Sequence, residues 1–525
     1  MAGLKIYDTT LRDGNQARGI SLSLEDKIRI ARKLDEAGIH YIEGGWPNPT
    51  SPTDVKFFER IRSEKLKNSR VAAFGSTCRA KNKPQDDPTL TALVEAKTPV
   101  ITIFGKSWDL HVTDVIKTTL DENLRMIHDS VKFLKGKCEE VVYDAEHFFD
   151  GYKCNPEYAM KTLKAAEEAG ADCIVLCDTN GGCLPMDFGD IYKAVKAKVK
   201  TPLGVHTHND SGCAVANSMV AAANGTVMIQ GVINGFGERC GNANLSTIIP
   251  NLSLKLKIKT LPDESLRRMK ELSVFVSEIA NVVHDERQPY VGEAAFSHKG
   301  GAHIDGVMKV TRSFEHVDPE LVGGSRQYIL SDQGGGAAIV EKLKKYNPNA
   351  GKKDPAVVKL LDHVKKMEHA GYQFEAAEGS FNLLMQKELN RFKEPFRFLG
   401  FRVIEEQMED GTLFSEATIK VEADGKIEHT AADGNGPVSA LDHAIRKALI
   451  KFFPCLKDVH LVDYKVRVLD GKDGTNAKVR VLITSTDGEE SWGTIGVSEN
   501  IIEASWIALI DSLNYKLSKE EGRKK

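Results

Sequence analysis

The first half of the chain repeats one pattern, in which a short apolar run is followed by a turn and an amphipathic helix. Eight runs have the length and composition of buried strands: Leu4–Asp8, His40–Gly44, Arg70–Gly75, Val100–Gly105, Glu140–Glu146, Cys173–Thr179, Leu203–His208 and Val227–Gly235. Helical stretches lie between them, such as the one that Ser23 begins, with apolar residues at helical spacing from Ile28 to Ala37. Eight strands alternating with helices over roughly 240 residues predict a (β/α)8 TIM barrel.

A doubly wound open sheet is the alternative architecture for alternating strands and helices. That fold is expected to carry a glycine-rich phosphate turn after its first strand. Here the turn is Thr9–Gly14, which is charged rather than glycine-rich. The barrel is therefore the favoured prediction.

The second half of the chain has a different pattern. Residues 276–395 are mainly helical and are broken at Gly334–Gly336 and Tyr346–Gly351, which predicts helical linker subdomains. From Phe396 onward the pattern changes to strands. We expect three domains, namely a catalytic barrel over 1–275, the linker over 276–395 and a C-terminal α+β regulatory domain over 396–525.

The C-terminal domain contains an internal repeat. Its halves begin at Glu416–Gly425 and Ala477–Gly488, continue through Gly434–Gly436 and Gly493–Gly496, and end in helices through Leu449 and Leu513. Two such halves indicate a pseudo-symmetric domain of sheets and helices.

Composition narrows the functional classes. The chain has 525 residues and a formal net charge of −3, with no basic run beyond Arg523–Lys525, which argues against nucleic-acid binding. The N-terminus leads directly into a strand, with neither a signal peptide nor an apolar stretch long enough for a membrane. Nine cysteines without a C-x-x-C pair favour reduced thiols. We expect a soluble, cytoplasmic protein.

Polar side chains gather where the predicted strands end, which is where barrel enzymes carry their chemistry. His206 and His208 lie two apart on one strand, so both imidazoles face the same side. Two such nitrogens form half of a metal site, although histidines with ordinary hydrogen bonds are the alternative. Turn-forming residues also favour strand ends. However, polar residues recur at six of the eight predicted strand ends, and turns alone do not readily explain so many.

Three separated stretches resemble the signatures of the acyl-CoA-condensing TIM-barrel synthases, which include 2-isopropylmalate, homocitrate and citramalate synthases. They are Asp8–Gln16, the His206/His208 pair and Gly237–Asn244. Within the family, Gly44–Pro49 and His316–Val322 resemble the citramalate synthase branch. This resemblance implies condensation of acetyl-CoA with pyruvate, followed by thioester hydrolysis, in isoleucine biosynthesis. 2-Oxoisovalerate, the acceptor of leucine biosynthesis, and the homocitrate synthase reaction are the alternatives.

The resemblance also implies a divalent metal ion (Mg, Mn or Zn). Asp13, His206 and His208 would be its ligands, with Asn242 close by. A carboxylate and two imidazoles leave positions open for a 2-oxo acid and water. The acid would chelate the ion through its carboxylate and ketone oxygens, so that Asp13 also belongs to the substrate site.

Catalytic and substrate-binding roles follow from the same resemblance. Arg12 would donate to the ketone oxygen as it becomes an alkoxide, although a structural ion pair is its alternative role. Thr179 would hold the substrate carboxylate, unless its hydroxyl only bonds backbone. Glu146 is a candidate base for the acetyl-CoA methyl group if partial burial raises its pKa. Its alternative is an ordinary solvated or ion-paired carboxylate.

A second candidate for the base lies beyond the barrel. Phe296–Gly306 resembles the family's post-barrel segment and would place His303 and Asp305 at a catalytic position. In the family this segment reaches the barrel of the partner subunit, which implies a homodimer. Some relatives carry a tyrosine a few residues later, where this chain has Phe314, and a phenyl ring cannot donate a hydrogen bond.

The tail resembles the family's allosteric, dimer-forming domain, and isoleucine is the expected effector. The turns at Gly434–Gly436 and Gly493–Gly496 each precede a predicted helix, so their amides could receive a carboxylate. An amino-acid-sensing protein without turnover, and a lyase running the reverse cleavage, are the other functional hypotheses. The joint presence of the barrel's polar residues favours the synthase: Arg12, Asp13, Glu146, His206 and His208.

Overall fold

The computed structural model divides the chain into two compact units. One comprises Met1–Phe296 with Glu315–Arg326, and the other Ser297–Phe314 with Gln327–Lys525. The described residues are 3–48, 51–329, 339, 340, 343, 351, 354–374, 376–469 and 477–523. The expected division into three domains stays a prediction. Among the described residues, no helix is both long and apolar enough to cross a bilayer.

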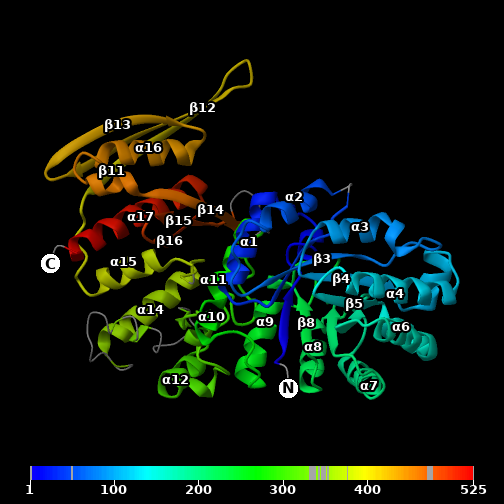
Figure 1. Ribbon diagram of the computed structural model, residues 1–525. Coiled ribbons are helices and arrows are strands. Elements are labelled where there is room, and N and C mark those ends of the chain that lie inside the picture. Colours follow the sequence, from blue (N-terminus) through cyan, green and yellow to red (C-terminus); the bar gives the residue numbers. More distant parts are fainter. Residues whose placement is uncertain are drawn as a thin grey trace. The chain divides into compact units, whose positions relative to one another are not determined.

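The first unit is a closed barrel of eight parallel strands in sequence order, with β8 paired to β1 (Figure 1). The strands are β1 (Lys5–Asp8), β2 (Tyr41–Gly45), β3 (Arg70–Ser76), β4 (Val100–Lys106), β5 (Glu140–Glu146), β6 (Cys173–Asp178), β7 (Leu203–Thr207) and β8 (Met228–Gly231). The predicted barrel is confirmed. Only the last strand was predicted much too long, because Ile233–Gly235 forms a 3-10 turn in which Asn234 has φ of 65°.

Helices surround the barrel and supply the apolar layer outside its strands. They are α1 (Leu24–Glu36), α2 (Pro52–Ile61), α3 (Pro88–Glu95), α4 (Leu120–Lys135), α5 (Phe148–Cys154), α6 (Pro156–Glu168), α7 (Pro185–Lys196), α8 (Ala214–Ala223), α9 (Leu245–Pro250), α10 (Asp263–Arg267) and α11 (Met269–Ile279). Ser23 begins α1 through a reciprocal capping box with Asp26, as its sequence predicts. Ile28, Ala31 and Leu34 of that helix are fully buried in the barrel core.

The second unit begins with the segment after the barrel. It contains α12 (Gly301–Lys309), α14 (Pro355–His369), α15 (Glu378–Glu388) and a parallel pair of β9 (Ser297–His298) with β10 (Gln327–Tyr328). The breaks predicted at 334–336 and 346–350 lie outside the described residues. α14 and α15 contribute to one apolar cluster, which includes Val357, Phe381 and Ile495.

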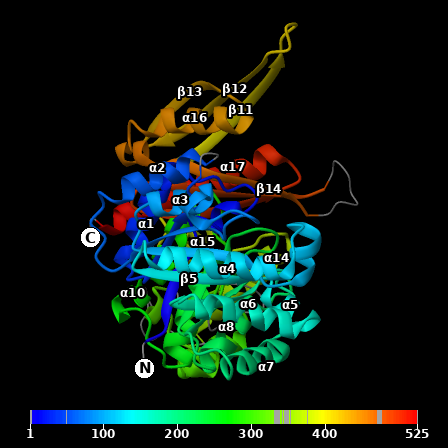
Figure 2. The ribbon, with the colours of Figure 1, turned by 45° about the vertical axis from the view of Figure 1, so that its right-hand side comes forward.

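The C-terminal part confirms the internal repeat, because each half has three antiparallel strands and a helix (Figure 2). The halves are β11 (Arg397–Gln407), β12 (Leu413–Ala423), β13 (Lys426–Gly434) and α16 (Pro437–Leu449), then β14 (His460–Val468), β15 (Val479–Thr486), β16 (Ser491–Ser498) and α17 (Ile501–Arg523).

The turn expected at Gly493–Gly496 was wrong, because these residues lie inside β16. A Cβ atom at Gly496 would overlap the carbonyl oxygen of Ala504, and one at Gly493 would overlap that of Ala376. These glycines therefore serve close backbone packing rather than a turn.

Candidate active site

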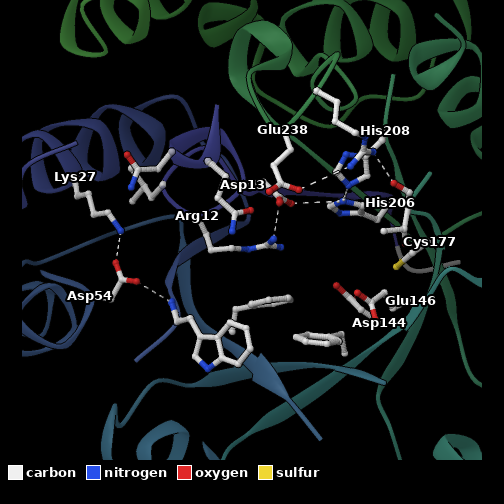
Figure 3. Close-up of a pocket in the computed structure, with 18 residues that line it drawn as sticks. Arg12, Asp13, Lys27, Asp54, Asp144, Glu146, Cys177, His206, His208 and Glu238 are labelled. Carbon is white, nitrogen blue, oxygen red and sulfur yellow. Dashed lines mark hydrogen bonds and ion pairs between the residues drawn. The ribbon is translucent and has the colours of Figure 1, made fainter. Parts of the chain in front are cut away.

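A cavity of about 320 Å³ lies at the carboxyl ends of the barrel strands (Figure 3). Loops that follow several different strands line it, as expected for barrel enzymes. The cavity includes most of the barrel residues that the sequence singled out: Arg12, Asp13, Glu146, Thr179, His206 and His208.

The three predicted metal ligands converge at one side of the cavity. His206 Nε2 lies 3.2 Å from His208 Nε2 and 3.5 Å from Asp13 Oδ2. Ligand atoms bound about 2.1 Å from one ion at tetrahedral or octahedral angles lie about 3.0–3.4 Å apart. All three side chains are buried. Their spacing and chemistry therefore fit a divalent ion.

Asn242 lies next to His208 in the fold. Its backbone pairs with that of His208 in an isolated β-bridge. Its side-chain Oδ1 is buried and accepts no hydrogen bond, which is unusual for a buried amide oxygen. An oxygen left in this state fits a role as a ligand.

In the described part of the chain, no three His, Cys, Asp or Glu side chains have the full arrangement of a bound metal site. The donor atoms of Asp13, His206 and His208 nevertheless have the spacing of ligands around one ion.

A buried hydrogen-bond network orients His206. Gln230 on β8 donates through Nε2 to Asp144 Oδ1 at 3.0 Å, so its Oε1 faces His206 Nδ1 at 2.8 Å. This arrangement puts the imidazole proton on Nδ1 and leaves the Nε2 lone pair directed towards Asp13 and His208. The sequence analysis missed Gln230, which is fully buried and whose partners lie on other strands.

Arg12 is held firmly in the cavity. Its Nε donates to Glu43 Oε1 at 2.6 Å, its Nη1 donates to Asp13 Oδ1 at 2.5 Å, and its guanidinium lies 3.8 Å from the ring centre of Phe74. Burial alone would lower the pKa of Arg12, but the carboxylates of Asp13 and Glu43 raise it. The guanidinium is therefore a permanent cation in the cavity.

The protonation states of the donors suit metal binding. Burial, followed by the neighbouring His206, lowers the pKa of His208 to about 3. Burial alone would raise the pKa of Asp13, but Arg12 and the two histidines lower it overall. At neutral pH His208 is uncharged and Asp13 is a carboxylate, which are the forms that bind a cation.

Glu146 and Thr179 lie in the cavity, and each makes the contact that was given as its alternative role. Glu146 forms an ion pair with Lys106 of β4, and its side chain is 22% exposed rather than enclosed by apolar groups. The Thr179 hydroxyl accepts the backbone N–H of His147 at 2.9 Å. Its hydroxyl hydrogen remains available for another acceptor.

An aromatic cluster of Trp46, Phe74 and Phe104 lines the cavity and was also missed. Trp46 meets Phe74 and Phe104 edge-on at 6.0 and 5.6 Å, and these two rings stack at 5.5 Å. Aromatic residues near the ends of β3 and β4 were the available signal in the sequence.

His303 and Asp305 lie on α12, in the other compact unit. Their approach to a cavity stays a prediction. The ring of His303 stacks on Phe314 at 4.2 Å, and Asp305 pairs with Lys309 at 2.7 Å. Phe314 is therefore a ring neighbour of His303.

Comparison with protein families decides the relationship. Residues 3–275, more than half of the chain, match the HMGL-like family. The chain belongs to this family. Residues 290–371 match the homocitrate synthase post-HMGL domain-like family, and residues 375–517 match the LeuA allosteric (dimerisation) domain. The family resemblance seen in the sequence is confirmed, and HMGL-like enzymes depend on a divalent metal and use acetyl-CoA.

Curated relatives match over nearly the whole chain. The (R)-citramalate synthase of Geobacter sulfurreducens is 55% identical and covers 99% of both chains. That of Aquifex aeolicus is 54% identical and covers 98% of both. The 2-isopropylmalate synthase of Clostridium kluyveri is 31% identical and covers 97% of this chain and 96% of its own.

Proposed function

We propose that this HMGL-like protein is a citramalate synthase, which condenses acetyl-CoA with pyruvate and hydrolyses the thioester to release citramalate and CoA. Five relatives named (R)-citramalate synthase are 45–55% identical to it over nearly its full length. Two relatives named 2-isopropylmalate synthase, from Clostridium kluyveri and Methanocaldococcus jannaschii, are each 31% identical. This contrast is the observation that favours pyruvate, and isoleucine biosynthesis, over 2-oxoisovalerate.

Asp13, His206 and His208, with Asn242 beside them, would hold the divalent ion. When bound, the ion supplies Lewis acidity towards the ketone of the 2-oxo acid. Gln230 keeps the Nε2 lone pair of His206 directed towards the ligand group. Magnesium, manganese and zinc all remain compatible with this mixed donor set.

Arg12 and Thr179 would bind the acceptor. Glu43 and Asp13 already orient the guanidinium of Arg12, so it needs little rearrangement to donate to the ketone oxygen. A preorganised cation stabilises the alkoxide that forms when the new carbon–carbon bond closes. The hydroxyl hydrogen of Thr179 would bond the carboxylate of the acceptor.

The aromatic cluster of Trp46, Phe74 and Phe104 would limit the size of the acceptor. These rings pack against one another and against Arg12, so one cannot move freely without the others. Pyruvate has only a methyl group beside its ketone. An isopropyl group at that position adds bulk that a tightly packed wall accepts poorly.

Two groups are candidates for the base that removes a proton from the acetyl-CoA methyl group. Glu146 lies in the cavity with Lys106 as its ion-pair partner. His303 and Asp305 would act instead if α12 of a partner subunit covers the cavity. The match of residues 375–517 to an allosteric dimerisation domain supports a homodimer, and we propose isoleucine as its effector.

The proposed reaction is tested by measuring release of the CoA thiol from acetyl-CoA with pyruvate, 2-oxoisovalerate and 2-oxoglutarate. We expect kcat/KM to be highest for pyruvate and the activity to disappear when a chelator removes the divalent ion. Higher kcat/KM for 2-oxoisovalerate would identify a 2-isopropylmalate synthase, and for 2-oxoglutarate a homocitrate synthase. Thiol release with none of them would leave an amino-acid-sensing protein without turnover.

A further inference from the structure

An ion pair between a buried lysine and a partly buried aspartate lines the cavity, on the side opposite His206 and His208 (Figure 3). Lys27 of α1 is only 1% exposed, and its Nζ pairs with Asp54 of α2. The same ammonium group donates to the carbonyl oxygen of Gly44 at 3.1 Å. The pair therefore joins two helices to the end of β2.

Asp54 also holds the loop that follows β2. Its Oδ2 accepts the backbone N–H of Trp46 at 3.1 Å and the Ser51 hydroxyl at 2.9 Å. Gly45 has φ of 145°, and a Cβ atom there would lie 2.5 Å from the Asp54 carboxylate. Glycine is needed at this position, because any side chain would block the carboxylate from the loop backbone.

Stability alone does not account for such a pair. Removing two charges from water costs several kcal/mol for each ion, and an apolar pair of similar volume often stabilises a fold equally well. What the pair adds is position, since the buried ammonium of Lys27 must stay close both to the Asp54 carboxylate and to the Gly44 carbonyl oxygen. The group so fixed is the backbone of Trp46.

Trp46 carries this constraint into the cavity. Its ring packs edge-on against Phe74 and Phe104. Phe74 in turn lies under the guanidinium of Arg12. A displacement of the Trp46 backbone would thus shift these aromatic rings. The cavity would become larger, and the packing of Phe74 against Arg12 would be disturbed.

We propose that the Lys27–Asp54 pair is a positioning device, which fixes Trp46 and thereby sets the size of 2-oxo acid that the cavity accepts. The inference rests on the proposed function, because acceptor selection exists only if 2-oxo acids are condensed. Neither Lys27 nor Asp54 needs to touch the acceptor in this role. Their effect on specificity passes through Trp46.

The test compares Asp54→Asn with a matched control, Asp35→Asn. Asp35 lies near the end of α1, is 7% exposed, and accepts the backbone N–H groups of Lys67, Asn68 and Ser69. These residues precede β3, at the opposite end of the barrel from the cavity. Both variants make the same chemical change and remove charge from a loop-holding carboxylate.

The measured quantity is the ratio of kcat/KM for 2-oxobutanoate to that for pyruvate. The two acceptors differ by one methylene, a difference that a well-packed pocket discriminates about 10–200-fold. We expect Asp54→Asn to raise this ratio about tenfold. Asp35→Asn should leave the ratio unchanged, even if it lowers the melting temperature as much.

A double variant keeps the test valid if Asp54→Asn folds poorly. Lys27→Met with Asp54→Leu replaces the pair by apolar side chains of similar length, so no buried charge is left unpaired. We expect this protein to fold and to carry the same relaxed ratio. An unchanged ratio in this folded protein would overturn the proposal.

Trp46→Leu shows whether the pair acts through Trp46. If it does, adding Asp54→Asn to Trp46→Leu changes the ratio little further, because residues in one path are not additive. Independent, additive effects would overturn the proposal. A wild-type protein that condenses no 2-oxo acid would instead refute the proposed function.

Discussion

Gln230 shows how one side chain outside the ligand group controls it. Its amide bridges Asp144 and His206 and sets which imidazole nitrogen carries the proton. Gln230→Leu keeps a similar volume but removes both hydrogen bonds. Loss of an outer partner of this kind typically weakens metal binding about 10–100-fold.

We therefore expect Gln230→Leu to bind Mn²⁺ about 10–100-fold more weakly in a calorimetric titration. Gln288→Leu is the control, because Gln288 is also buried but donates to Asn234, which does not line the cavity. Equal Mn²⁺ affinity in the two variants would show that the Gln230 bridge does not orient His206.

Asp8 gives the stability of the barrel a pH dependence. Burial is the largest influence and raises the pKa of Asp8 to about 7, although hydrogen bonds from Thr10 lower it in part. The ordinary value for aspartate is 3.8. Because the folded state holds this proton more tightly than the unfolded state, the contribution to stability falls as pH rises from about 4 to about 7.

Asp8→Asn removes this titration but keeps an oxygen that can accept the Thr10 amide hydrogen. Between about pH 5 and pH 8 we expect the melting temperature of the variant to rise by several degrees relative to wild type. Thermal unfolding of metal-free protein measures this difference. Parallel pH profiles would mean that Asp8 does not titrate in this range.

At the scale of elements, the barrel strands were predictable because each is an apolar run bounded by turn signals. The prediction failed where the residue types indicated one backbone conformation and the chain adopts another. Val232 and Ile233 are apolar and buried but follow β8 rather than extend it, since a turn begins there. Gly493 and Gly496 looked like a turn, yet they lie in a strand that other backbone approaches closely.

The candidate site divides in the same way. Asp13, His206 and His208 were predictable because ligands need recognisable residue types at strand ends. Gln230 and Lys106 were not, since each acts through a partner on another strand that only the fold brings near. Spacing along the chain carries no information about such pairs.

The close packing of strand β16 against helix α17 can be tested by substitution. Gly496→Ala would drive a methyl group into the carbonyl oxygen of Ala504, and backbone cannot yield as a flexible side chain does. We expect a loss of about 1–3 kcal/mol in unfolding free energy. Gly436→Ala is the control, because no atom lies within 4 Å of its added methyl group. Equal stability of the two proteins in denaturant titrations would contradict this account.

For the whole molecule, the central question is how an effector on the C-terminal domain reaches the reaction. Removing residues beyond Glu394 is a poor test, because α15 would lose its partners. Ser380 on α15 accepts the backbone N–H of Ile495 in β16 at 3.0 Å, and Phe381 lies with Ile495 in one apolar cluster. Truncation there would expose that apolar surface, so a loss of regulation could not be distinguished from a loss of folding.

The full-length chain allows a cleaner separation of the two activities. His208→Ala removes a proposed metal ligand of the barrel, so we expect citramalate formation to fall at least about a hundredfold. Isoleucine should still bind this inactive protein with unchanged affinity, because residues 375–517 match the allosteric domain and His208 lies outside them. Calorimetry measures isoleucine binding to the variant, and an activity assay measures inhibition of the wild-type enzyme by isoleucine.

Linkage requires that isoleucine and the substrates alter one another's affinity by the same factor in the wild-type protein. Loss of isoleucine binding in His208→Ala would place the effector on the barrel, and wild-type activity indifferent to every branched-chain amino acid would leave the C-terminal domain with dimerisation alone.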